Sequence, residues 1–424
     1  MKILILGTTG ESIPPPYAGI PKHTLLLARN WGKDDNIVGV SFVYKHEHSD
    51  DLGAGAQYFF EYEKKPNKLD KLIFLIKYFI KNPLLYFKLL STHSKYNRTD
   101  KEAILYSAYG VYVDQIIKKF KPDVCMIEAA LIKGFMAASV CKMRNIANAI
   151  HVYAEVHDLS MTPNKHLKSN PQRLKKYWIN YFENTDLILS PSEYCANGPK
   201  NYVEASKIKT VYFGIDVGIY EKFTESKELC RSKLNLPKNS FIVTAVGAFT
   251  ARKGHDHLIK AASILNKRGI EISVALCGPG DKRWLEEIAR QEKIDGDVFF
   301  YTGISEDDLM SLYRASDLYC DASNTVRACL GMSLTEGMIM GLPAVVYRSG
   351  GMPEVVFDGS NGYIADTDDI DMLADKIEKV INLNSDQYAA LSSNAIKTAK
   401  EYVDINSESE RVLELLSNIV SKGK

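Results

Sequence analysis

The residue types between 327 and 345 are those that a nucleotide phosphate would need. Gly331 lies in a loop after the apolar run 317–320, and the helix that we expect to begin near Met332 carries Glu336 in its early turns. A glycine lets backbone approach a phosphate, and the unpaired N–H groups and dipole of the helix stabilise its negative charge. A carboxylate one turn into the helix can accept both hydroxyls of a ribose. Glycines at such positions also form ordinary turns and helix caps, and for this loop alone that interpretation is the better supported one.

A second loop, at residues 247–256, has the basic residues that a diphosphate would need. Gly247 directly follows a predicted strand, and Arg252 and Lys253 precede a predicted helix. Cations at the carboxyl end of a parallel strand are placed to neutralise a diphosphate leaving group. A solvated basic turn would have the same residues. Two loops of this kind in one half of the chain, both where a strand leads to a helix, favour the phosphate interpretation.

The elements that must position these loops alternate along most of the chain as short apolar strands and amphipathic helices. This alternation is typical of a doubly wound parallel α/β fold. The stretch 254–267, for example, repeats Leu258, Ile259, Ala262 and Leu265 at the 3.6-residue period of one helix face. The strands are predicted near 2–7, 36–43, 123–127, 149–156, 186–190, 241–247, 271–277, 297–301, 317–320 and 343–347.

Turn-forming residues between 198 and 240 divide these strands into two series. A chain of 424 residues is also too long for one ordinary core and suits two. We therefore expect an α/β chain with two Rossmann-like domains that face each other across a cleft. The first would comprise residues 1–200 with a C-terminal helix, 402–424, packed back on it, and the second residues 201–401.

The composition is that of a globular protein, with 46% hydrophobic and 25% charged residues. The formal net charge of +1 gives no general field that would attract nucleic acid. The seven cysteines are odd in number and form no C-x-x-C pair, which indicates a reducing compartment without disulfides or structural zinc. Met1 leads directly into the first strand, which leaves no room for a signal peptide, and no apolar run reaches the roughly 18 residues of a membrane span. We expect a cytoplasmic protein.

The run from about 242 to 366 resembles the donor domain of family 4 of the glycosyltransferases, which have the GT-B fold. The matching pieces occur in the family's order and spacing: GAFTARKG (247–254), LCGPG (276–280), VFFYTGI (298–304), LYRASDLY (312–319), the block 331–345, and GGMPEVV (350–356). Weaker matches extend into the first half: AGIPKHT (18–24), HDL (157–159), DLILSPSE (186–193) and FGID (213–216).

The resemblance implies a bacterial-type enzyme that moves a hexose-type sugar from a nucleotide diphosphate sugar to a glycan or lipid-linked acceptor. The reaction would retain the anomeric configuration, need no metal or other cofactor, and serve the synthesis of cell-surface polysaccharide. Lys253 would contact the diphosphate, Arg252 would add charge beside it, and His157 would lie near the reacting sugar. The donor would also be held by Gly19, Gly247, Gly303, Ile304, Gly331, Met332, Ser333, Leu334 and Glu336.

Two positions depart from the family pattern. The first of two glutamates eight positions apart is replaced by Ala328, and the arginine expected after the first glycine is replaced by Ala248. Arg252 or Arg327 could supply the missing charge. The departures leave open that the chain is a catalytically degenerate GT-B partner subunit.

Three further alternatives follow from the sequence. A nucleotide-sugar 2-epimerase shares the fold and the donor. A nicotinamide dehydrogenase is ranked low, because the loop 7–12 lacks G-x-G-x-x-G. His157 taken alone fits a hydrogen-bonded structural histidine, and only the family match favours a role near the sugar.

Residues 64–98 combine lysines with an apolar helical stripe that includes Leu72, Ile73, Ile76 and Ile80. Such a segment can lie on an anionic membrane surface, which would suit a lipid-linked acceptor and place the protein peripherally on the inner face of the cytoplasmic membrane. An ordinary domain helix with solvated lysines explains the pattern equally well.

Overall fold

The computed structural model of the chain describes residues 1–6, 19–33, 36–45, 56–95, 101–154, 156–157, 170–325 and 328–422. The chain forms two compact units. Unit 1 comprises Met1–Tyr212 together with Ile405–Lys424, and unit 2 comprises Phe213–Asp404. None of the helices in the described part of the chain has both the length and the apolar character that crossing a bilayer requires.

Unit 1 is built on a parallel sheet with the strand order β3-β2-β1-β4-β5-β6-β7 within the described residues. The register places Ile3 beside Val38 on one side and Val124 on the other. The strands are β1 (Lys2–Leu6), β2 (Ile37–Tyr44), β3 (Ala56–Tyr62), β4 (Val124–Glu128), β5 (Ala147–His151), β6 (Leu187–Ser190) and β7 (Ile208–Thr210).

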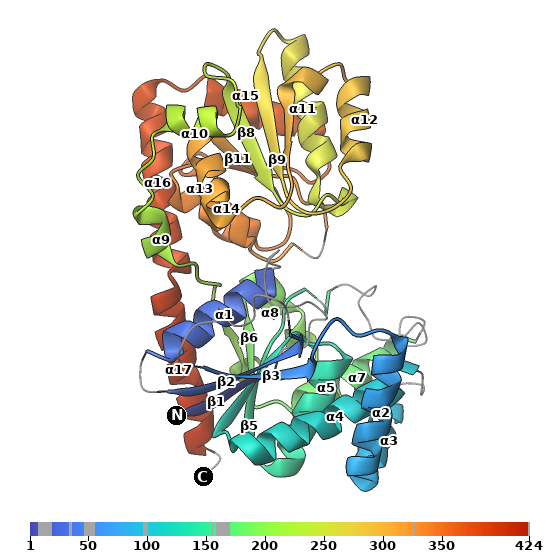
Figure 1. Cartoon of the computed structure of the whole chain (residues 1–424). Coiled ribbons are helices and arrows are strands. Elements are labelled where there is room, and N and C mark those ends of the chain that lie inside the picture. The colour runs from blue at the N-terminus through green and yellow to red at the C-terminus, as the bar shows by residue number, and fades with distance from the viewer. Residues whose placement is uncertain are drawn as a thin grey trace. The chain divides into compact units, whose positions relative to one another are not determined.

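Helices cover both faces of this sheet, because successive side chains of β1 point to opposite sides. Ile3 and Ile5 belong to the apolar core with α1 and α17, whereas Leu4 and Leu6 belong to the core with α4, α5 and α7 (Figure 1). The helices of unit 1 are α1 (Gly19–Trp31), α2 (Lys68–Lys81), α3 (Pro83–Ser94), α4 (Lys101–Phe120), α5 (Ile132–Arg144), α7 (Pro171–Glu183), α8 (Glu193–Asn197) and α17 (Ile405–Lys422).

Unit 2 has its own parallel sheet, with the order β10-β9-β8-β11-β12-β13. Its strands are β8 (Phe241–Val246), β9 (Ile272–Cys277), β10 (Val298–Tyr301), β11 (Leu318–Asp321), β12 (Ala344–Tyr347) and β13 (Gly362–Ala365). Its helices are α9 (Val217–Glu221), α10 (Lys227–Lys233), α11 (His255–Lys267), α12 (Arg283–Gln291), α13 (Glu306–Ala315), α14 (Met332–Ile339), α15 (Ile370–Ile381) and α16 (Ser385–Val403). Helices α11, α12 and α15 share the core on one face, and α10 and α13 pack on the other.

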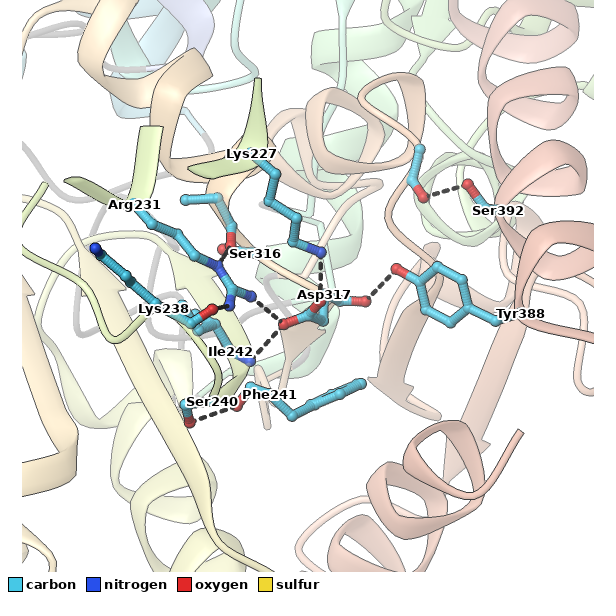
Figure 2. A network of polar contacts seen from close by, with 12 residues as sticks. Lys227, Arg231, Lys238, Ser240, Phe241, Ile242, Ser316, Asp317, Tyr388 and Ser392 are labelled. Atoms are coloured by element: carbon cyan, nitrogen blue, oxygen red, sulfur yellow. Dashed lines mark hydrogen bonds and ion pairs between the residues drawn. The ribbon is translucent and has the colours of Figure 1, made fainter. Parts of the chain in front are cut away.

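One carboxylate fixes the amino ends of β8 and β11 in unit 2. Asp317 accepts hydrogen bonds from the backbone N–H of Ile242 at 2.7 Å and from Arg231 Nη2 at 2.7 Å, and it pairs with Lys227. On the opposite side, Tyr388 Oη donates to the Asp317 carbonyl at 2.7 Å. Figure 2 shows these side chains converging on Asp317 from α10 and α16. The contacts align the two central strands, whose carboxyl ends carry the loops singled out in the sequence.

The C-terminal helix α17 completes unit 1 although it follows unit 2 in the chain. Trp31 Nε1 donates to the Ser409 carbonyl at 3.3 Å, and Asn30 Nδ2 to the Ile405 carbonyl at 3.4 Å. Val412 and Leu416 are buried against the sheet face of Ile3 and Ile5 in the same core. The helix therefore supplies part of the apolar layer of the first unit.

The expected fold class, two Rossmann-like α/β domains with parallel sheets, is confirmed. The structure divides the chain after Tyr212 instead of after residue 200, because β7 pairs with β6 and so belongs to the first sheet. It returns to unit 1 at Ile405, three residues after the expected start of the final helix. Strands β3, β7 and β13 lie outside the series of strands predicted from the sequence.

Candidate functional site

The carboxyl ends of β8 and β9 are held together by close backbone contacts at two glycines. Gly247 N donates to the Cys277 carbonyl at 2.8 Å. A Cβ on Gly278 would lie 1.9 Å from the Gly247 carbonyl oxygen, so only glycine fits there. The loops after the two strands consequently form one backbone surface at this edge of the sheet, where open α/β sheets bind ligands.

Lys253 extends across Gly247. The short helix η5 (Ala251–Lys253) ends at Gly254, which has φ +65° and precedes α11. A Cβ on Gly247 would lie 3.2 Å from Lys253 Cε, which shows that the lysine stem runs along the bare glycine. Within the described residues neither Lys253 nor the exposed Arg252 has an ion pair, so both charges are available at the strand end.

The N-terminus of α14 is bonded to the same strand end. Gly331 precedes the helix with φ +87°. Ser333 Oγ donates to the Val246 carbonyl at 3.0 Å, and Tyr319 Oη donates to Ser333 Oγ at 2.9 Å. The first-turn N–H groups of Met332, Ser333 and Leu334 have no acceptor inside the helix. They therefore lie next to the loop that carries Lys253 and can bind an anion with it.

Glu336 lies one turn further into α14 and is 4% exposed. Its Oε2 accepts a hydrogen bond from Tyr313 Oη at 3.0 Å, and Tyr220 also bonds its carboxylate. Burial, and then the nearby carboxylate, raise the pKa of both tyrosines, so they stay protonated and donate. Neither tyrosine has a role predicted from the sequence, although Tyr313 lies within the LYRASDLY motif.

The loop after β10 continues the same edge of the sheet. Gly278 N donates to the Tyr301 carbonyl at 3.0 Å, which joins this loop to the one after β9. Gly303 has φ +66°, and nothing lies within 4 Å of the place a Cβ would occupy. Ile304 packs against the core that contains Cys277. The backbone at Gly303 is thus open to contact by a ligand.

The structure brings the predicted residues of unit 2 to one sheet edge, and two predicted residues lie in unit 1. Gly19 is the first residue of α1. His157 Nε2 donates to the Tyr194 carbonyl at 2.8 Å, and its ring stacks on Tyr194 with centroids 4.6 Å apart. This bond orients the imidazole and puts a proton on Nε2. The proposed position of His157 near the sugar stays a prediction.

A buried polar cluster that the sequence does not predict lies at the sheet edge of unit 1. Glu128 ends β4 and His151 ends β5, with Glu128 Oε1 3.0 Å from His151 Nδ1 and Oε2 accepting from Tyr153 Oη at 2.6 Å. His23 of α1 pairs with Glu408 of α17 at 2.7 Å, and the two histidine rings lie 5.7 Å apart. Burial opposes ionisation of Glu128, but His151, His23 and the Tyr153 hydroxyl together hold its pKa below the ordinary value.

The two departures from the family pattern differ in their surroundings. The backbone of Ala328 packs closely against the loop that contains Gly350 and Gly351. A Cβ on Gly350 would be 1.6 Å from the Ala328 carbonyl oxygen, and Gly351 N donates to the Cys329 carbonyl at 2.6 Å. Ala248 accepts a hydrogen bond from Thr250 N in the loop after β8. Arg327 and the loop 7–12 lie outside the described residues.

No cluster of three or more histidine, cysteine, aspartate or glutamate side chains in the described ranges has the arrangement of a metal site. All seven cysteines are free thiols, and six of them are buried. Independently of this, Lys253, Arg252 and the amino end of α14 place positive charge and N–H donors that can stabilise a diphosphate at the end of β8.

The chain is similar in sequence to known glycosyltransferases. Residues 226–398 match the family described as "Glycosyl transferases group 1". The chain is 27% identical over 266 residues to a D-inositol 3-phosphate glycosyltransferase of Corynebacterium urealyticum, covering 59% of this chain and 61% of that protein. It is 28% identical over 211 residues to the lipopolysaccharide core biosynthesis glycosyltransferase LpsE of Rhizobium meliloti, covering 49% of this chain and 57% of that protein.

The chain thus spans less than two thirds of the length of these curated relatives. Among solved structures, Anabaena Alr3699/HepE in complex with UDP and glucose is similar in fold, with a TM-score of 0.71 and 18% identity. The similarity covers 99% of this chain and 100% of that one. The likeness in fold therefore extends over both units.

Proposed function

We propose that this chain, which carries a group 1 glycosyl transferase region at residues 226–398, transfers a hexose-type sugar from a nucleotide diphosphate sugar to a glycan or lipid-linked acceptor. The observation that carries the proposal is the position of Lys253. Its stem crosses Gly247 at the end of β8, and Ser333 bonds the N-terminus of α14 to the same strand end. A cation and a set of unpaired N–H groups at one sheet edge suit a diphosphate.

In the proposed reaction, the bond between the anomeric carbon and the diphosphate oxygen breaks. A bond to the acceptor oxygen forms on the same face of the sugar, and the acceptor proton passes to the leaving diphosphate. Lys253 and the first turn of α14 stabilise the charge that develops on that group, without a metal. Arg252, exposed one residue away, adds positive charge, and His157 acts near the sugar from unit 1.

Other residues are proposed to contact the ribose, the base and the phosphates of the donor. Glu336 would accept ribose hydroxyls, with Tyr313 and Tyr220 fixing its carboxylate. The open backbone at Gly303 and Ile304 would contact the base. Gly19, at the start of α1, would contribute N–H groups from unit 1.

Thermal unfolding with UDP, GDP, ADP, TDP and CMP tests the donor site. A ligand present at about 100 times its dissociation constant stabilises the folded protein by roughly 2.7 kcal/mol, which raises the midpoint of thermal unfolding by several degrees. We expect a shift with one base, and its loss in Lys253→Ala but not in Lys397→Ala, a matched change at an exposed lysine of α16. With the matching donor sugar, Lys253→Ala should lower turnover by roughly 100-fold or more.

The opposite results are equally informative. No stabilisation by any nucleotide, with the protein folded, would refute a working donor site and favour a degenerate partner subunit with Ala248 and Ala328. Conversion of the donor sugar without an acceptor would indicate a 2-epimerase. Turnover by Lys253→Ala at the level of the Lys397→Ala control would contradict the placement of the diphosphate.

A further inference from the structure

Helices α2 and α3 present an unusually apolar surface to solvent. Eleven large hydrophobic side chains are exposed among the described residues, and seven of them belong to these two helices. We call these seven the apolar face: Leu69, Leu72, Ile73, Ile76, Ile80, Leu84 and Phe87, which are between 47% and 85% exposed. Clustered exposure of this kind marks an interaction surface, whereas isolated exposed hydrophobics are normal.

The apolar face does not pack into the core of unit 1. The side of α2 that does pack into the core is a different one. It carries Phe74 and Tyr78, which are buried against Tyr112 with ring centroids 5.8 Å and 5.5 Å apart. On α3 the core uses Tyr86 and Leu89. Helix α2 is therefore apolar on two sides, one that packs on α4 and one that faces solvent.

The apolar face of α2 has the geometry of a continuous stripe. At 3.6 residues per turn, its five members on α2 fall within about 100° of the helix circumference. Lys77 borders one edge of the stripe and Lys68 lies beyond the other. Helices α2 and α3 lie side by side (Figure 1). The ring centroids of Phe79 and Phe87 are 5.6 Å apart, so the two helices are in contact and their exposed residues belong to one surface element.

Both helices have hydrogen-bonded amino-terminal caps. Asn67 caps α2 with a reciprocal pair of bonds to Asp70. Asn82 ends α2 and caps α3 by accepting from Leu85 N at 3.1 Å, with Pro83 in the first turn. The exposed apolar residues therefore belong to folded, capped helices that hold them in place.

The charges around the apolar face identify its partner. Between residues 64 and 95 the chain has eight lysines and, as carboxylates, only Asp70. Within the described residues none of the lysines of α2 and α3 forms an ion pair; Lys77 lies over the Tyr78 ring at 5.1 Å. Leucine and isoleucine flanked by unpaired lysines fit the acyl chains and phosphate headgroups of an anionic bilayer.

We infer that α2 and α3 dock unit 1 onto an anionic lipid surface, with the apolar face entering the headgroup boundary and the lysines contacting lipid phosphates. The docking surface comprises residues 68–94 of the predicted segment 64–98, and the last three residues of that segment lie outside the described part of the chain. It is independent of sugar transfer, because docking requires no donor.

Flotation with vesicles tests this inference on the full chain. Two compositions are compared: phosphatidylcholine alone, and an equal mixture of phosphatidylcholine and phosphatidylglycerol. We expect binding to the mixed vesicles that weakens with salt, since surface charges are screened. Leu72→Gln with Ile76→Gln should weaken binding roughly tenfold or more, because two side chains no longer transfer to the bilayer.

The chain offers a matched control. Ile219 and Leu229 of unit 2 are 46% and 56% exposed, against 47% for Ile76 and 52% for Leu72. Ile219→Gln with Leu229→Gln should bind as the unchanged protein does, and equal unfolding midpoints would show that both double variants fold. Three outcomes would overturn the inference: no binding to either vesicle, equal loss in both double variants, or self-association that the Leu72 and Ile76 changes abolish while vesicle binding stays.

Discussion

Removal of the Asp317 carboxylate should selectively destabilise unit 2. Its side chain is 16% exposed and accepts from Arg231, whose side chain is 7% exposed, from Lys227, and from the N–H of Ile242. Asp317→Ala would leave the Arg231 guanidinium buried without its counter-charge and one strand N–H without its acceptor. Breaking a buried pair in this way costs about 3–5 kcal/mol.

We expect a value near the lower end, about 3 kcal/mol, because Arg231 keeps its bonds to the carbonyls of Ala315 and Lys238. Lys227, which is 36% exposed, can be resolvated. For a unit of this size the change corresponds to a fall in midpoint of roughly 6–12 °C. Asp317→Asn should cost less, since the amide oxygen can still accept from Ile242.

Hydrogen exchange measured by mass spectrometry is the appropriate assay, because a chain with two units need not unfold in one step. Exchange should accelerate in β8 and β11 and stay unchanged in β1 and β4. Asp281→Ala provides the control, because its ion pair with Arg283 is exposed on the same unit and should have no resolvable effect. The reasoning would be refuted if Asp317→Ala behaved like Asp281→Ala, or if both units lost protection equally.

The structure also predicts the direction in which two further substitutions change the stability of the protein. Gly254→Ala should destabilise by roughly 3 kcal/mol or more, because the new Cβ would lie 1.9 Å from the Ala322 carbonyl at φ +65°. Gly269→Ala, at φ +80° with open space, should cost only about 1 kcal/mol, and urea unfolding of the two variants checks the difference. The folded pKa of Glu128 lies below its unfolded value, so its ionised form stabilises above about pH 4.5 and this contribution is lost on acidification. Glu128→Gln, which cannot ionise beside His151, should therefore lose stability less steeply than the unchanged protein in urea unfolding below about pH 5; parallel curves would contradict this.

The sequence predicted the central strands well because they are buried on both faces. Such strands appear as continuous apolar runs between turn residues, as in β4 and β9. The edge strand β3 has the mixed sequence AQYFFEY and is half-buried, so its pattern is weak. Strand β7 has three residues, too few for any periodicity, and forms only because β6 offers an edge to pair with.

In the candidate site, too, some residues could be predicted from local sequence and others could not. Gly247, Lys253 and Gly331 were predictable because each follows a strand and precedes a helix, a local signal. The hydrogen-bond partners of Glu336 could not be predicted, because Tyr313 reaches the Glu336 carboxylate only through the packing of α13 on α14. The pair His23–Glu408 joins residues 385 positions apart, a separation at which local patterns give no information.

The place of α17 in unit 1 also determines the order in which the units can be completed during synthesis. A ribosome releases β1, α1, β2 and β4 first, but the part of the Ile3 and Ile5 sheet face that α17 covers stays exposed until α17 has emerged. Unit 2 is one continuous stretch, Phe213–Asp404, and can close before that moment. The unit that is made first is thus finished last. During that interval its exposed apolar layer is the part of the nascent chain most in need of a chaperone.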